Sequence, residues 1–295
     1  IIPLLIIPQM ILGGAIFSYD KLNYMIGGGM DKNVPIIADF MPTRWGYEGL
    51  VVETYVKNEY GKKFYEIEKK ESICTYKQSY YIPLLRDLIY ESKLGLNSTL
   101  GVSQGQAILN LMILKNEIAE ENKINPTVQF PSPIRIASGN LNNELVEELE
   151  SYLRDINNFY SLIFNALSIR KAIINAEMNN DDVNFLRTLK NNYYNNNLNE
   201  LVTNSLLKKR IIITHDFEVM QKMDPIYLFP SKTNFLDIRT HFYSPKKYFF
   251  GILLDTFWFN ILIVWLYAVL LLVILYYNIL KKAMSIISTT TWFLK

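Results

Sequence analysis

The chain has 295 residues, half of them hydrophobic, and a formal net charge of only +2. Because basic residues are scattered among acidic ones and form no stripe, we expect no nucleic-acid partner. The single cysteine excludes an intrachain disulfide, so any part outside the cytoplasm must be held together by packing. Apolar residues gather at both ends, whereas residues 57–210 are rich in Asn, Lys and Glu and are typical of a water-soluble part.

The first apolar run, residues 1–17, contains a single polar side chain, that of Gln9. We interpret residues 1–19 as the end of a truncated spanning helix that its prolines would kink. Gly13 and Gly14 would permit close approach of another helix in lipid. A signal peptide is the alternative interpretation, but the run lacks a basic leader and a small-residue cleavage site.

Residues 20–60 are predicted to form a loop followed by a re-entrant or interfacial helix. The three glycines at 27–29 are not followed by the Lys-Ser/Thr pair of a phosphate loop, which favours a flexible loop. Pro42 at the expected first position and Gly61 just beyond the end bracket an amphipathic helix over residues 42–60. A helix in a soluble core would show a similar pattern, and that alternative stays open.

Residues 61–245 are predicted to form a mainly helical, water-soluble insert between the two apolar ends. Short helical patterns alternate with loops over residues 62–123. The clearest early pattern covers Gln104–Asn122. Apolar side chains at alternating steps of four and three over residues 141–178 predict one long helix with a seam. A second helix over 182–208 should return along it as an antiparallel hairpin, with a dimeric coiled coil as the alternative. Residues 211–214 are typical of a short strand.

The last apolar run, from Thr256 to Leu280, carries no charge. It is long enough to cross a hydrocarbon core of about 30 Å as a tilted helix. Lysines flank it at both ends and aromatic residues lie near its ends, so we predict a final spanning helix over residues 246–282 and a tail over 283–295. The lysines do not decide which side of the membrane the tail occupies, because they stand at both ends of the run. A wholly buried helix of a large soluble protein is the alternative.

Three polar residues in or beside the apolar runs are candidates for functional contacts. Gln9 and Asn260 are predicted to hydrogen-bond between helices or to face a substrate. Asp255 directly precedes the uncharged run, where a carboxylate belongs at the interface or beside a polar partner. Our hypothesis is that Asp255 contacts Arg44. Exchanging the two charges should then restore the expression lost in each single variant, and no recovery would exclude the contact.

The sequence carries no motif for nucleotide binding or catalysis. There is no G-x-x-x-x-G-K-S/T loop, and Ser98 and Ser103 have no nucleophile elbow or triad context. The polar run at His215, Asp216 and Glu218 lacks the fixed spacing of a metal site, which favours ordinary surface residues. We therefore expect this segment to have no enzymatic activity, no cofactor and no metal of its own.

Taken in order, four stretches resemble one family: IPQMILGGAIF, PTRWGYEGL on a predicted short helix, a large polar insert, and HFYSPKKYFFGILLDTFWFNILIVWLYAVLLLVILYYNILKK. They are similar to the C-terminal part of the membrane domain of ABC exporters of the white/pigment (G) subfamily. They are closer still to large ABC transporter permeases of Bacteroidetes bacteria. The resemblance covers both ends of the chain, whereas residues 57–210 match no module.

The resemblance implies a mostly α-helical protein of the bacterial inner membrane, with residues 61–245 extracytoplasmic and the tail over 283–295 cytoplasmic. Residues 1–17 would be the end of the fifth spanning helix, and residues 257–280 the sixth. Ala15 and Ile16 would stand where two bulky residues plug the top of the family's translocation cavity, although Ala15 is smaller than the usual Leu. The re-entrant signature of the family is matched by Pro42, Arg44, Trp45, Gly46, Tyr47 and Glu48.

The function that the resemblance implies is transport. The chain would be the C-terminal fragment of the transmembrane permease domain of an ATP-driven exporter, forming part of the translocation path and its outer gate. ATP and Mg²⁺ would be bound by an ATPase domain elsewhere, and membrane domains of this class pair as dimers. The other partners would be the bilayer and the remaining membrane helices. A membrane-anchored scaffold or receptor that binds a protein partner through its helical insert is the alternative.

Overall fold

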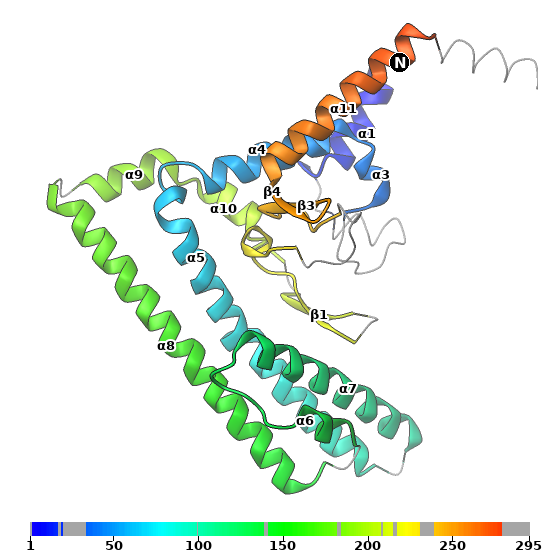
Figure 1. Ribbon diagram of the computed structural model, residues 1–295, viewed down its shortest axis with the longest axis vertical. Helices are drawn as coiled ribbons and strands as arrows, with labels where there is room; N and C mark the ends of the chain where they lie inside the picture. Colours follow the sequence, from blue (N-terminus) through cyan, green and yellow to red (C-terminus); the bar gives the residue numbers. More distant parts are fainter. Residues whose placement is uncertain are drawn as a thin grey trace, which may run out of the picture. The chain divides into compact units, whose positions relative to one another are not determined.

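The computed structural model describes residues 2–16, 19, 34–98, 100–138, 141–181, 184–207, 209–214, 217–230 and 239–278. Over these residues the chain is mostly helical, as predicted (Figure 1). It divides into two compact units, the first made of Ile1–Thr54 and Leu228–Lys295 and the second of Tyr55–Tyr227. The second unit is therefore inserted in the chain between two halves of the first. The predicted glycine loop at 27–29 and the tail at 283–295 lie outside the described residues.

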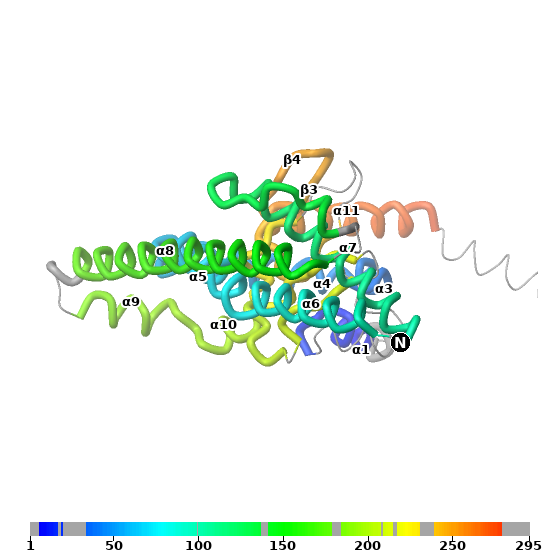
Figure 2. Tube along the Cα trace, turned by 90° about the horizontal axis from the view of Figure 1, so that it is seen from below, coloured from blue at the N-terminus to red at the C-terminus, as the bar shows by residue number. Residues whose placement is uncertain are grey.

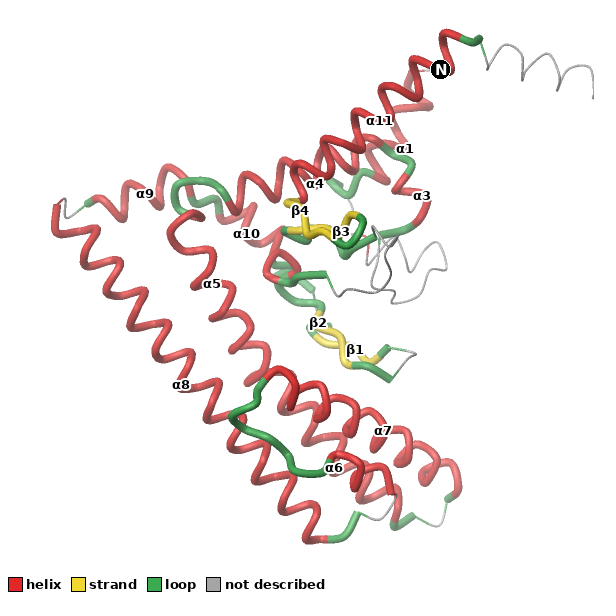
Figure 3. The backbone as a smooth tube through the Cα atoms, viewed as in Figure 1, coloured by secondary structure: helices red, strands yellow, loops and turns green. Residues whose placement is uncertain are grey.

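The first unit contains helices from both ends of the chain and one β-hairpin (Figure 3). Its described elements are α1 (Ile2–Leu12), α3 (Ile36–Asp39), α4 (Pro42–Val56), β3 (Lys246–Phe249), β4 (Ile252–Asp255) and α11 (Thr256–Tyr276). The last two residues of α4 belong to the second unit.

The chain turns sharply after α1, at Gly14, whose φ is +80°. A Cβ at this position would lie 2.7 Å from the ring of Phe242 and 2.8 Å from that of Tyr19, so a larger residue would both clash and be strained. The Tyr19 hydroxyl donates a hydrogen bond to the Leu12 carbonyl at 2.6 Å and closes the turn. Gly14 therefore serves close packing within this unit, in addition to any role in lipid.

α11 is long and apolar enough to cross a membrane, and only 11% of its most apolar window is buried within the structure. A core helix of a soluble protein would be buried over most of its length. The predicted bounds of 246–282 need correction, because α11 begins at Thr256 and residues 246–255 form the β3–β4 hairpin. Those residues are apolar enough to extend the helical pattern, but the Phe250-Gly251 pair turns the chain back instead.

The prediction that short helices alternate with loops over residues 62–123 is wrong for residues 61–96. α5 (Gly61–Tyr76), the π-helical turn η1 (Lys77–Tyr81) and α6 (Ile82–Leu96) follow one another without a loop. Pro83 explains the π-helical turn, because it has no N–H to donate to the preceding turn and its ring would clash there. Gly61 begins α5 rather than ending α4, since its N–H donates to the Asn58 Oδ1 at 2.6 Å.

The core of the second unit is built by α5, η1, α6, α7 (Gly101–Ile124) and α8 (Asn143–Asp181). α7 extends the predicted helix over 104–122, and α8 confirms the long helix over 141–178. α8 packs along α5, η1 and α6, as two views agree (Figures 1 and 2). Its buried seam in this core consists of Leu145, Leu149, Tyr152, Leu153, Ile156 and Tyr160.

The second helix predicted over 182–208 is instead two short helices, α9 (Phe185–Tyr193) and α10 (Asn196–Val202). Asn195 separates them, because its side chain accepts a hydrogen bond from the Leu198 N–H at 3.1 Å and caps α10. α9 meets only the C-terminal end of α8, where Leu189 packs near Ile174 and Met178. Most of the α8 seam thus packs on α5 and α6 and not on a hairpin partner.

The remaining described elements of the second unit are short. The predicted strand is β1 (Ile211–Ile213), which pairs antiparallel with β2 (Val219–Gln221), with Ile212 opposite Met220. Two 3₁₀ turns, η2 (Pro133–Ser138) and η3 (Pro225–Tyr227), complete the list.

Truncating Leu149 tests the assignment of the α8 seam. Leu149 is fully buried, so Leu149→Ala should cost about 2–5 kcal/mol of stability. Leu162 lies on the same helix but is 70% exposed, so Leu162→Ala should change stability by less than about 0.5 kcal/mol. The thermal midpoint of the detergent-solubilised chain, followed by circular dichroism, measures both. Equal midpoints for the two variants would contradict the packing of α8 described above.

Candidate functional site

The candidate site lies in the first unit and starts from the first turns of α4. Arg44 and Glu48 are one helical turn apart, and their side chains are 1% and 0% exposed. The Arg44 guanidinium carbon lies 3.8 Å from the centroid of the Trp45 ring, within the range of a cation–π interaction. The indole N–H of Trp45 in turn donates to the Asp39 carbonyl at 2.9 Å, which ties α4 to the end of α3.

A second cation reaches the same carboxylate from a distant part of the sequence. The Nζ of Lys247, on β3, lies 2.7 Å from the Oε2 of Glu48, and both side chains are fully buried. Arg44 Nη2 is 3.8 Å from the same oxygen. Buried carboxylates and ammonium groups are costly to desolvate unless they are paired. Neither charge could therefore be buried here without the other.

Asp39 extends the pair into a cluster. Its Oδ1 lies 3.2 Å from Arg44 Nη1, without the alignment of a hydrogen bond, and its Oδ2 accepts a hydrogen bond from Arg239 Nε at 2.9 Å. We define the ionic cluster as Asp39, Arg44, Glu48, Arg239 and Lys247. It contains three cations and two carboxylates.

Asn260 connects α11 to the ionic cluster. Its Nδ2 donates to the Trp45 carbonyl at 2.9 Å and to Glu48 Oε2 at 3.1 Å, and the side chain is 1% exposed. Close approach is possible because α4 has a glycine here: a Cβ on Gly49 would lie 3.3 Å from the Asn260 Cβ. The predicted hydrogen bond of Asn260 across helices is therefore present.

The surroundings shift the proton affinities of the central pair. Burial lowers the pKa of Lys247 to about 8, although the adjacent Glu48 carboxylate counteracts part of this effect. Burial also opposes ionisation of Glu48, but the charges of Lys247 and Arg44 outweigh it and hold the pKa of Glu48 below its ordinary value. The two cations thus favour the charged form of Glu48 and can hold α4 and β3 together electrostatically.

The residues predicted for function fall into two groups. Arg44, Trp45 and Glu48 are brought together with Asn260, while Pro42 begins α4 and Gly46 lies within it. The other predicted residues lie outside the cluster's described contacts: Ala15 and Ile16 are exposed after α1, Gln9 is half-buried and accepts a hydrogen bond from Thr43 Oγ1 at its carbonyl, and Asp255 ends β4 opposite Lys246. The contact between Asp255 and Arg44 stays a prediction.

Sequence reasoning missed Asp39, Arg239 and Lys247. From the sequence, both Lys246 and Lys247 are predicted to flank the spanning helix. A signal was available, because neighbouring residues of a strand point to opposite faces and only one of two adjacent lysines can face water easily. No local pattern marks Asp39 or Arg239.

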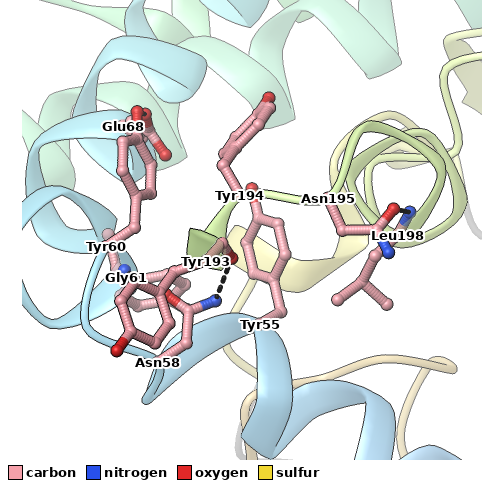
Figure 4. A pocket seen from close by; sticks show the side chains of 10 residues that line it. Tyr55, Asn58, Tyr60, Gly61, Glu68, Tyr193, Tyr194, Asn195 and Leu198 are labelled. Carbon is pink, nitrogen blue, oxygen red and sulfur yellow. Dashed lines mark hydrogen bonds between the residues drawn. The ribbon is translucent and has the colours of Figure 1, made fainter. Parts of the chain in front are cut away.

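The second unit has one small pocket among its described residues that merits attention (Figure 4). It is lined mainly by tyrosines, with Tyr60 donating a hydrogen bond to Glu68 at 2.8 Å. The pocket encloses about 10 Å³ of free space, which is about the minimum for one water molecule. It therefore has no room for a substrate in this conformation.

The residues considered for a metal site give no further support. His215 and Asp216 lie outside the described residues. Among the residues that are described, no group of three or more His, Cys, Asp or Glu side chains is placed to hold a metal ion.

Comparison with protein-family models gives no match, and comparisons with curated proteins and with solved structures give no significant match.

A double-mutant cycle tests the central pair. Glu48→Leu or Lys247→Met alone leaves the other charge buried and unpaired, so each should lower the free energy of unfolding by about 3–5 kcal/mol. The double variant should lose much less than the sum of the two single losses, because neither charge remains to be desolvated. Thermal midpoints in detergent measure the coupling.

The control is Glu59 with Lys62, a pair at the same 2.7 Å but half-exposed. The corresponding Glu59→Leu and Lys62→Met variants should show no coupling, because solvent screens exposed charges. Additive losses at Glu48 and Lys247 would contradict the buried pair.

Proposed function

We propose that this chain is the C-terminal part of the transmembrane permease domain of an ATP-driven exporter resembling the G subfamily of ABC transporters. The observation that supports it best is the joining of α11 to the α4 signature by Asn260 and Glu48. An apolar, largely exposed helix needs lipid or other membrane helices around it, and a buried polar contact fixes which of its faces meets α4.

In this proposal α11 crosses the inner membrane as the last spanning helix, and α1 contributes to the helix preceding the outer loop. α4 lies at the outer end of the translocation path, and the second unit is extracytoplasmic. The ionic cluster lets α4, the β3–β4 hairpin and the start of α11 move as one rigid piece. ATP binding on an ATPase domain elsewhere would rock the helix bundle, and this rigid piece would transmit the motion to the outer gate.

The partners that the proposal requires are chemical consequences of this arrangement. The exposed apolar side chains of α11 require the bilayer and the remaining membrane helices. A second membrane domain would complete the path, as in exporters of this class. ATP and Mg²⁺ belong to the ATPase domain, and the absence of an active site in this segment stays a prediction.

A second candidate function, that of a membrane-anchored scaffold, is favoured by one observation on α8. Leu162, Ala166, Ile169 and Ile173 are exposed and follow steps of four, three and four residues. This is the spacing with which a helix receives a helical partner. In that reading the second unit binds a protein, and α11 only tethers it.

The decisive experiment uses the complete reading frame that contains this chain. Its product, reconstituted in lipid vesicles alone or with an ATPase subunit encoded beside it, should hydrolyse ATP, and the transported compound should stimulate the rate. Replacing α11 by an unrelated apolar helix of the same length should abolish the stimulation, because Asn260 is lost.

A complete protein without any ATPase activity, alone or with a neighbouring subunit, would contradict the exporter. A tether has no such requirement for the identity of α11. Partner binding that survives the same helix replacement would therefore favour the scaffold.

A further inference from the structure

The β3–β4 hairpin has an unusual turn. Phe249 is paired with Ile252, so Phe250 and Gly251 form a two-residue connection, and their φ angles are +48° and +81°. Turns of this kind with two positive φ values strongly favour Asn-Gly or Gly-Gly. A bulky aromatic residue in the left-handed region is disfavoured there, so the stability of the turn does not explain why a phenylalanine occupies it.

The same hairpin presents apolar side chains to its surroundings. Phe250 is 51% exposed and Ile252 64% exposed, and the rings of Phe249 and Phe250 stack edge to face with centroids 4.5 Å apart. Trp258, in the first turn of α11, is 62% exposed. Aromatic residues with an exposed apolar body gather where a membrane meets water.

The base of the hairpin is fixed to the start of α11. β4 runs into α11 without a linker, and the Thr256 N–H donates to the Pro245 carbonyl at 3.1 Å. The Thr256 hydroxyl also donates to the Ser244 carbonyl at 2.6 Å. In both views the hairpin projects sideways from the end of α11 rather than continuing along it (Figures 1 and 2). A hairpin held in this way stays at the depth of the helix end.

The lysine at the base of the hairpin is also suited to the interface between membrane and water. Lys246 begins β3, and its Nζ lies 6.0 Å from the centroid of the Phe229 ring. Lys246 is only partly buried, and a partly exposed lysine beside an aromatic ring is suited to the headgroup region.

We infer that the tip of the β3–β4 hairpin, Phe249–Ile252, inserts into the lipid–water interface of the leaflet at the N-terminal end of α11. The hairpin is a lateral anchor that fixes the depth and rotation of α11, and through Lys247 it fixes the position of α4. This inference rests on the proposed function in one respect, namely that α11 crosses a bilayer.

Spin labels placed on the full chain test the inference. The native thiol is first removed by Cys74→Ser, and single cysteines are introduced by Phe250→Cys, Val269→Cys or Glu177→Cys. Val269 lies in the middle of α11, and Glu177 is exposed on α8 in the second unit. Each protein is reconstituted in vesicles of phosphatidylcholine and phosphatidylglycerol, and the accessibility of the label to oxygen and to a water-soluble nickel chelate is measured.

The expected ratio of oxygen to nickel accessibility is highest at Val269, lowest at Glu177 and intermediate at Phe250, severalfold above the value at Glu177. A ratio at Phe250 equal to that at Glu177, with Val269 in lipid, would overturn the anchor and leave the spanning helix intact. A water-accessible Val269 would overturn both proposals. Spin–spin broadening at Phe250 that disappears on dilution with unlabelled protein would overturn the lipid partner in favour of a second copy of the chain.

The variant Phe250→Asn separates insertion from folding of the hairpin. Asparagine suits the turn better than phenylalanine, so the hairpin should keep its structure. A label at Ile252→Cys should nevertheless move towards water in this background, with the oxygen-to-nickel ratio falling severalfold. An unchanged ratio at Ile252 would contradict the anchoring role of Phe250.

Discussion

The buried pair of Glu48 and Lys247 is the constraint on which the first unit depends. The two residues are 199 positions apart in the sequence, yet their charged atoms lie 2.7 Å apart without access to solvent. Neither charge can be buried alone, because the effective cost of desolvating one ion is several kcal/mol. The α4 segment and the β3–β4 hairpin must therefore fold together, although a complete folded unit separates them in the chain.

Such a pair is a poor source of net stability, because the attraction between buried charges often does no more than repay their desolvation. Its value here is specificity. The exposed face of α11 is apolar almost throughout, and in the bilayer that we propose for it apolar side chains would gain little from preferring a helix over lipid tails. The amide of Asn260 donates to two acceptors on α4, the Trp45 carbonyl and Glu48. Polar contacts thus decide the rotation of a helix that hydrophobicity alone leaves undetermined.

The sequence predicts a helix correctly where the apolar pattern or length of that helix alone is sufficient. The helices α4, α7, α8 and α11 have apolar periodicity or length that local physics explains, and Asn260 is a polar group in an apolar run, whereas Arg44 and Glu48 are identified by the family signature. Prediction from sequence failed where a structure depends on a contact between residues far apart in the chain, or where a turn lacks its usual residues. Loops were predicted between short helices over residues 62–123, but a π-helical turn at Lys77–Tyr81 joins α5 to α6 without one. The β3–β4 hairpin was missed because its Phe250-Gly251 turn lacks the usual asparagine, and Lys247 was missed because its partner lies 199 residues away.

Closing a long insert costs chain entropy, and contacts within the second unit offset that cost. Bringing the ends of a flexible segment of this length together would cost about 4–5 kcal/mol. Tyr55 and Tyr227 are the first and last residues of the second unit, and their hydroxyls are hydrogen-bonded at 2.7 Å across 172 positions. Tyr55 also donates to Asn199, and Tyr65 donates to the carbonyl of Ile226, so two of the tyrosines that line the small pocket help to close the unit at its ends. The core packing of the second unit therefore offsets the closure cost, and the halves of the first unit are connected by a segment whose ends already lie together. This allows an insert far longer than a loop to separate Glu48 from Lys247 without weakening the pair.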